Sequence, residues 1–162
     1  MEEAKYLVNK RVLIVDDEPD VLETLLDLLP MCEVETAASF DEAKKLLTTK
    51  YFDIAILDIM GVDGYQLLEI ANKHDIIAVM LTAHALSTDN ILKSHKGGAA
   101  SYIPKEKMAE ITVFLNDVLE AKDKGKNFWW RWLDRLGDYC EKKFGKDWQQ
   151  KDEEYWKKYI HY

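Results

Sequence analysis

Residues 53–58 read DIAILD, a short apolar run enclosed by two aspartates. Similar runs stand on either side of it in the chain, RVLIVD at residues 11–16 and IIAVMLT at residues 76–82. Nearly continuous apolar runs of this length are typical of parallel strands that are covered by helices on both faces. The three segments therefore predict the centre of an α/β fold with a buried parallel sheet.

Strand-like and helix-like segments alternate outward from these runs. Two further strand-like segments are VETAA at residues 34–38 and ASYIP at residues 100–104. Helical patterns occupy residues 21–30, 41–47, 65–74, 90–96 and 108–122. Strict alternation with short connections implies right-handed crossovers between parallel strands. We therefore expect a doubly wound, five-stranded parallel sheet with five helices.

Polar side chains gather where the predicted strands end. They are Asp16, Asp17, Asp58, Thr82 and Lys105. Ligands of doubly wound sheets bind beyond the carboxyl ends of the strands, so we expect these side chains to converge there. Clustered carboxylates repel one another, and Mg²⁺ relieves that repulsion while keeping affinity for phosphate oxygens. The edge therefore predicts phosphoryl chemistry, in which Lys105, the Thr82 hydroxyl and the Ala83 N–H neutralise the transferred group.

Charge and composition exclude several classes of protein. The formal net charge is −8, with 12 Lys and Arg against 22 Asp and Glu in residues 1–122, and 10 against 8 in residues 123–162. This balance repels a phosphate backbone, so we do not expect nucleic acid as a partner. The N-terminus starts acidic, and no apolar run reaches membrane-spanning length, which predicts a cytoplasmic protein. Cys32 and Cys140 lack metal-site spacing and are expected to be buried thiols.

The composition changes after Lys122, and all 5 tryptophans lie beyond that residue. We place a boundary there, with a sheet domain at residues 10–122 and a Trp-rich helical extension at residues 123–162. Asn127 can cap a first helix that Gly145 ends. Its apolar stripe is Phe128, Trp132, Leu136, Cys140 and Phe144. Asp147 and Gln150 form a capping-box pattern for a second helix. The second helix carries Trp148, Tyr155, Trp156, Tyr159 and Ile160.

Four motifs stand at the predicted strand ends in a fixed order: LIVDDEPD at 13–20, AILDIM at 55–60, VMLTAHA at 79–85 and SYIPK at 101–105. Together they resemble the CheY-like receiver domain of two-component signalling, because each motif falls on the matching strand end. The resemblance covers about residues 10–121. It implies a flavodoxin-like sheet with the strand order 2-1-3-4-5, to which two C-terminal helices are added.

The resemblance also implies roles for the residues at the sheet edge. Asp58 is the expected phosphoacceptor and a Mg²⁺ ligand, Asp17 binds Mg²⁺ directly, and Asp16 binds it through water. Met60 contributes its backbone carbonyl to the metal. Lys105 and the Ala83 N–H bind the phosphoryl group.

Thr82 and Tyr102 match the family's switch pair, in which the hydroxyl moves to the phosphate and the ring turns inward behind it. Equally, Thr82 can simply end a strand, and Tyr102 can be a half-buried ring whose hydroxyl reaches water. Pro104 matches a position that the family uses for a cis peptide bond before the lysine, whereas a trans bond is the ordinary case. His84 either tunes the lifetime of the phosphoryl group or is an exposed loop imidazole.

The loop after Asp58 departs from the family. It reads IMGVDGYQ, without the usual proline and about two residues shorter. We expect Gly61 and Gly64 to supply the unusual backbone angles of this tighter turn. The departure leaves open how a phosphodonor protein docks there.

The leading hypothesis is a response regulator that accepts a phosphoryl group from a histidine kinase or phosphotransfer protein. As the resemblance implies, it signals by binding a downstream protein or a second copy through the face between the fourth and fifth predicted helices and through the tail. The alternative is a scaffold that acts through its aromatic tail without phosphorylation. A phosphatase with a nucleophilic Asp58 is set aside, because Met60 stands where a second aspartate is needed.

Three roles remain open for the extension. The helices can pack on the sheet domain or on each other. They can also form a docking surface for a partner or a second copy, because Trp is enriched at interfaces. Binding to a membrane surface is the third role and the least favoured, because acidic residues interrupt the basic face that anionic lipid attracts.

Overall fold

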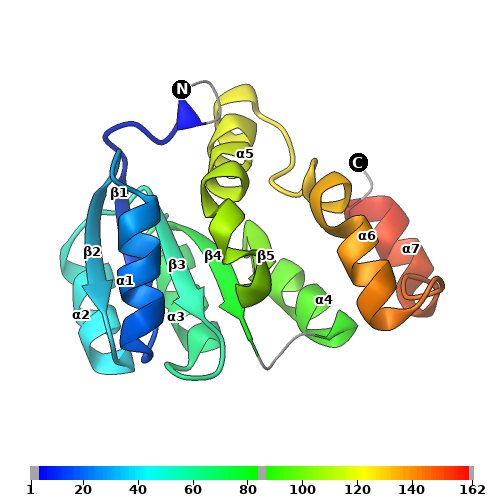
Figure 1. Cartoon of the computed structure of the whole chain (residues 1–162), viewed down its shortest axis with the longest axis horizontal. Helices are drawn as coiled ribbons and strands as arrows, with labels where there is room; N and C mark the ends of the chain where they lie inside the picture. Colours follow the sequence, from blue (N-terminus) through cyan, green and yellow to red (C-terminus); the bar gives the residue numbers. More distant parts are fainter. Residues whose placement is uncertain (1–3, 84–86, 161–162) are drawn as a thin grey trace.

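The apolar runs form a five-stranded, all-parallel sheet with the order β2-β1-β3-β4-β5 (Figure 1). The computed structural model describes residues 4–83 and 87–160. The strands are β1 (Arg11–Val15), β2 (Glu33–Ala37), β3 (Ile54–Asp58), β4 (Ile77–Thr82) and β5 (Ser101–Pro104). Both the doubly wound fold and the strand order expected from the sequence are confirmed.

Helices cover both faces of the sheet, since α1 packs against α5 and α2 packs against α3. Their bounds are α1 (Pro19–Leu28), α2 (Phe40–Thr49), α3 (Gly64–Lys73), α4 (Thr88–Lys96) and α5 (Ile111–Lys124), with a 3₁₀ helix at Lys105–Glu110 before α5. Every residue of β3 is buried. Burial on both faces explains why the central strands are apolar without alternation.

The tail, residues 125–160, packs on the face formed by α4, β5 and α5 (Figure 1). The Trp129 indole N–H donates to the Ala99 carbonyl, and the Trp132 indole N–H donates to the Tyr102 carbonyl, each at 2.9 Å. Among the three roles left open, packing on the sheet domain is therefore what the structure shows. Gly125, in the left-handed region at φ 65°, ends α5 and starts this segment.

The tail helices differ from the sequence prediction. Helix α6 spans Trp132–Phe144 with Arg131 at its N-cap, so it begins later than the expected cap at Asn127. The Asn127 side chain instead accepts the Trp129 N–H, which stabilises the turn before the helix. Gly145 ends α6 as predicted.

The second predicted helix is irregular rather than a single α-helix. It runs as a 3₁₀ turn (Gln150–Asp152), a short α-helical segment α7 (Glu153–Tyr155) and a π-helical segment (Trp156–Ile160). The Gln150 amide donates to the Asp147 carboxylate at 3.3 Å. That contact is not the reciprocal backbone bonding of a capping box. The side chains of Tyr159 and Ile160 lie outside the described part of the structure.

Both cysteines are free thiols; Cys140 is buried as expected, whereas Cys32 is half-buried. Burial raises the pKa of Cys32 to about 11 and that of Cys140 to about 12, so both stay protonated at neutral pH. Within residues 4–83 and 87–160, none of the helices combines the length and the apolar composition that crossing a bilayer requires.

We expect the packing of the tail on the sheet domain to depend on pH through His95 of α4. Its ring contacts Trp129 edge-on and hydrogen-bonds to the Tyr155 hydroxyl, and burial lowers its pKa below 6.5. A lowered histidine pKa means that the docked state binds fewer protons than the open state, so docking weakens as the pH falls through 6.5 and below. Quencher access to Trp should rise between pH 7.5 and pH 5, roughly the range over which a histidine titrates.

The His95→Gln variant should lose this pH dependence. His74→Gln, at an exposed position at the end of α3, is the matched control and should keep it. An unchanged pH profile in His95→Gln would contradict the assignment.

Candidate functional site

The carboxyl ends of the central strands lie level with one another. Asp58, the last residue of β3, is in register with Leu81, and Thr82, the last residue of β4, is in register with Pro104. Asp16 directly follows β1, and Lys105 directly follows β5. The sheet therefore brings together residues that lie up to 89 positions apart in the chain.

One ammonium group connects three carboxylates at this edge. The Lys105 Nζ lies 2.8 Å from Asp16 Oδ2, 2.8 Å from Glu18 Oε1 and 3.3 Å from Asp58 Oδ1. Asp16 is fully buried and Asp58 is 5% exposed. Buried carboxylates are costly unless they are paired, so Lys105 is the group that makes their burial tolerable.

The pKa values follow this balance of burial and charge. Burial raises the pKa of the Asp16 carboxyl above 3.8, against hydrogen bonds from Lys105 and the Glu18 backbone N–H, and the charge of Asp58 adds to the rise. Burial alone would lower the pKa of Lys105, but Asp16, Glu18 and Asp58 outweigh it and raise that pKa. Lys105 therefore remains a cation across the physiological range.

Gly61 lets the loop after β3 approach the acidic residues. Its N–H donates to Asp58 Oδ2 at 2.9 Å. A Cβ at Gly61 would lie 2.2 Å from Asp17 Oδ1, and one at Gly64 would lie 2.3 Å from the Asp58 carbonyl. The expectation that these glycines supply unusual backbone angles is wrong, because the left-handed residue of the loop is Asp63, at φ 55°. Both positions need glycine because a Cβ there would collide with atoms of Asp17 or Asp58.

A cavity of about 250 Å³ opens at the site. Its lining residues are Asp17, Glu18, Asp58, Met60, Gly61, Ala83 and Lys105. Ligand oxygens of Asp16, Asp17 and Glu18 lie within 4.8 Å of one another. Carboxylate oxygens are hard donors that suit Mg²⁺, and their mutual repulsion favours a cation, so these residues fit such an ion.

Thr82 ends β4, directly before the Ala83 that lines the cavity, and Tyr102 lies on the neighbouring strand β5. Thr82 is 1% exposed and Tyr102 is fully buried. Burial raises the pKa of Tyr102, and hydrogen bonds with the Ser87 backbone and the Thr82 side chain oppose that rise. The predicted switch pair is thus in contact, with the ring already inside the molecule. The half-buried ring weighed as the alternative is wrong.

Other predicted site residues are placed as follows. Ala83 and Met60 line the cavity, and the Met60 side chain is 68% exposed. No peptide bond among the described residues is cis, so the cis bond expected at Pro104 is wrong. Lys105 reaches the carboxylates across a trans bond. His84 lies outside the described residues.

Glu18 is the residue that sequence reasoning did not assign to the site. It lies two positions after Asp16, and its carboxylate shares the ammonium of Lys105. Glu18 starts α1 as its N-cap residue. A third acidic residue beside the pair Asp16 and Asp17 was the available signal, but only the geometry shows that it reaches Lys105.

Comparisons with known proteins agree with this geometry. The response regulator receiver domain family matches residues 12–116. Two-component response regulator ARR18 of Arabidopsis thaliana is 35% identical over 107 residues, which cover 62% of this chain and 17% of that protein. Heme response regulator HssR of Staphylococcus aureus (strain Newman) is 36% identical over 121 residues, which cover 71% of this chain and 54% of that protein.

A solved structure shows the same fold. It is a CheY-like response regulator receiver domain protein from Methanospirillum hungatei JF-1, with a TM-score of 0.66 and 30% identity, covering 72% of this chain and 98% of that one. The chain spans about half or less of the length of the two relatives named above. The family match, the sheet order and the acidic edge together establish that this chain belongs to the response regulator receiver domain family.

Proposed function

We propose that this receiver accepts a phosphoryl group on Asp58 from a histidine kinase or phosphotransfer protein and signals through protein–protein contacts. The observation that carries the proposal is the position of Asp58. Its Oδ1 lies 3.3 Å from the Lys105 ammonium, its Oδ2 accepts the Gly61 N–H, and it lines the cavity. An oriented carboxylate beside a fixed cation suits nucleophilic attack on phosphorus.

In the proposed step, an Asp58 oxygen forms a bond to phosphorus while the P–N bond to the donor histidine breaks. The imidazole nitrogen keeps the electron pair of that bond. The Lys105 ammonium loses part of its contact with Asp58 and binds the oxygens of the new phosphoryl group. The Thr82 hydroxyl and the Ala83 N–H add hydrogen bonds to that group, which spreads its charge. The acyl phosphate is then hydrolysed in the same site, with no separate substrate.

Mg²⁺ is the proposed cofactor, held by Asp58, Asp17, Asp16 through water, and the Met60 carbonyl. The ion supplies charge neutralisation for the phosphoryl oxygens. Glu18, whose ligand oxygen lies near those of Asp16 and Asp17, adds negative charge that favours the cation. The cytoplasmic setting expected from the sequence remains a prediction.

The decisive experiment is incubation with a small phosphodonor and Mg²⁺, followed by intact mass and peptide mapping. The wild type should gain one phosphoryl group on Asp58. Asp58→Asn should gain none, because its amide is no longer a nucleophile. Lys105→Ala should still be modified, but its conformation should change less on modification, because the ammonium couples the new charge to the conformation. Normal labelling of Asp58→Asn would favour a phosphorylation-independent scaffold instead.

Mg²⁺ should raise the thermal midpoint of the wild type, because it binds a carboxylate cluster that only the folded state assembles. At an ion concentration of 100 times Kd the gain is about 2.7 kcal/mol. Asp17→Ala should abolish the gain. Asp20→Ala, which removes an exposed acid in the first turn of α1, is the control and should keep it. Equal Mg²⁺ shifts in the two variants would count against the ligand set.

Gly61→Ala should lower stability and slow phosphorylation, since its Cβ would push Asp17 and Asp58 out of place. Overpacking of this kind costs about 1–3 kcal/mol. Gly137→Ala is the matched control: nothing lies within 4 Å of its Cβ on α6, and it should gain about 0.5–1 kcal/mol. Denaturant unfolding and labelling rates measure both effects. Equal behaviour of the two variants would refute the close approach.

A further inference from the structure

A second cavity lies at the end of the sheet opposite the acidic edge, and we call it the amino-end cavity. Its volume is about 360 Å³, against about 250 Å³ for the cavity at Asp58. Its lining residues are Tyr6, Lys10, Asp53, Leu119, Lys122 and Asp123. They belong to the segment before β1, to the residue that precedes β3 and to the last turns of α5. Figure 1 shows that segment beside the end of α5, away from the arrowheads of the strands.

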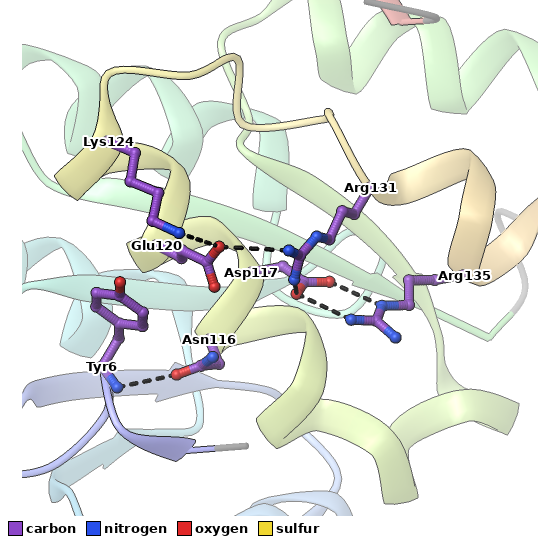
Figure 2. Close-up of polar contacts among 7 residues, drawn as sticks. All are labelled: Tyr6, Asn116, Asp117, Glu120, Lys124, Arg131 and Arg135. Carbon is purple, nitrogen blue, oxygen red and sulfur yellow. Dashed lines mark hydrogen bonds and ion pairs between the residues drawn. The ribbon is translucent and has the colours of Figure 1, made fainter. Parts of the chain in front are cut away.

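The first wall of this cavity is the segment of residues 4–10, which is fixed to the rest of the molecule. Leu7 is fully buried, and its carbonyl accepts the Cys32 thiol at 3.4 Å. The Tyr6 N–H donates to Asn116 Oδ1 of α5 at 2.9 Å (Figure 2). The backbone that presents Tyr6 and Lys10 to the cavity is therefore held on α5.

The other two walls come from the sheet and from α5. Asp53 is half-buried, and its Oδ2 accepts the Arg11 N–H of β1 at 2.9 Å. Leu119 of α5 is 6% exposed, and together with the half-buried Tyr6 ring it gives the cavity an apolar surface. Because each wall has its own anchor, the cavity is formed without a ligand, as small-molecule sites usually are.

Charges of both signs line the cavity. Lys10 and Lys122 contribute two ammonium groups, and Asp53 and Asp123 contribute two carboxylates. Within residues 4–83 and 87–160, the side chains of Lys10, Lys122 and Asp123 form neither a hydrogen bond nor an ion pair.

The neighbouring charges of α5 behave differently. Glu120 pairs with Lys124 at 3.0 Å and with Arg131 at 3.4 Å, and Arg135 binds Asp117 at 2.9 Å (Figure 2). This part of α5 thus has partners for its acids within the molecule. The charges of the amino-end cavity are instead open to a ligand.

The lining selects the charge of that ligand. A nucleotide or a phosphate would bring several negative charges against the two aspartates, and a polyamine would bring positive charges against the two lysines. A zwitterion can pair with both sets. The cavity volume lies within the range of about 300–1,000 Å³ that is usual for small-molecule sites. The apolar surface suits a ligand that also carries an aliphatic or aromatic group.

We propose that the amino-end cavity binds a free α-amino acid with an apolar side chain. The carboxylate of the ligand pairs with the lysines, its ammonium pairs with the aspartates, and its side chain packs on the apolar surface. Because such a ligand contacts all three walls, it fastens residues 4–10 to β3 and α5. This site is independent of the phosphoryl chemistry proposed for Asp58.

The first experiment titrates the full chain with L-phenylalanine and L-leucine and follows the amide chemical shifts. Two analogues of phenylalanine keep the ring and lose one charge each: phenethylamine lacks the carboxylate, and 3-phenylpropanoate lacks the ammonium. At least one amino acid should bind saturably below about 10 mM, and each analogue should bind at least about fivefold more weakly than L-phenylalanine or L-leucine.

The largest shifts should fall in residues 5–10 and 119–123. No saturable binding of either amino acid would overturn the proposal, and so would an analogue that binds as tightly as they do. Shifts centred on Gly61 and Ala83 would place the ligand at the acidic edge and would also overturn it.

The second experiment identifies the group that binds the carboxylate. Lys122→Gln should weaken the amino acid about two- to fivefold, as the loss of one exposed ion pair does. The same change should leave phenethylamine unaffected, because that analogue has no carboxylate to lose. Lys73→Gln, at an exposed position in the last turn of α3, is the matched control and should change neither affinity. Equal losses for both ligands in Lys122→Gln would show a merely structural effect and overturn the assignment.

The third experiment measures hydrogen–deuterium exchange of the Tyr6 N–H, which Asn116 accepts. A saturating amino acid should slow this exchange severalfold, because the ligand joins residues 4–10 to α5 and opposes their local opening. Unchanged exchange at saturation would overturn the bridging of the walls. Phosphorylation enters none of these measurements, so their failure would leave the proposed function of Asp58 standing.

Discussion

The contact of one lysine with three carboxylates is the interaction on which the rest of the molecule depends. Lys105 follows the last strand of the sheet, and Asp16 and Asp58 stand at the ends of two others. A parallel sheet that buries two carboxylates at its edge is stable only if a cation reaches both of them. The strand order β2-β1-β3-β4-β5 brings these three residues to the same edge of the sheet.

Much of this arrangement could be predicted from the sequence. Apolar runs that end in Asp16, Asp58 and Thr82 specify both the strands and the edge at which their polar residues meet, because parallel strands share one carboxyl end. Glu18 was missed because sequence position alone does not tell whether an exposed carboxylate reaches an ammonium 87 residues away. The role of Gly61 was misread because free space around a backbone atom is a property of packing, not of sequence.

The tail was harder to predict than the sheet. The periodicity of the apolar residues indicated α6 but not where it begins. An asparagine side chain suits both a helix N-cap and a turn, so the sequence could not tell which of the two Asn127 stabilises. The irregular segment after Gly145 is stabilised by the contacts of Trp148 and Trp156 rather than by a regular backbone pattern. Aromatic packing of this kind overrides local helix signals.

The indole contacts along β5 also have a consequence for solubility. An edge strand exposes hydrogen-bonding groups that can recruit a strand from another molecule, and natural sheets cover or interrupt such edges. Here the side chains of the tail cover the β5 edge. The Trp129 indole donates to the carbonyl of Ala99, just before β5, and the Trp132 indole donates to the carbonyl of Tyr102 within it. Because both indoles bind main-chain carbonyls, these two hydrogen bonds do not depend on which side chains β5 carries. The β5 edge is thereby shielded from pairing with a strand of another molecule for as long as the tail stays in place.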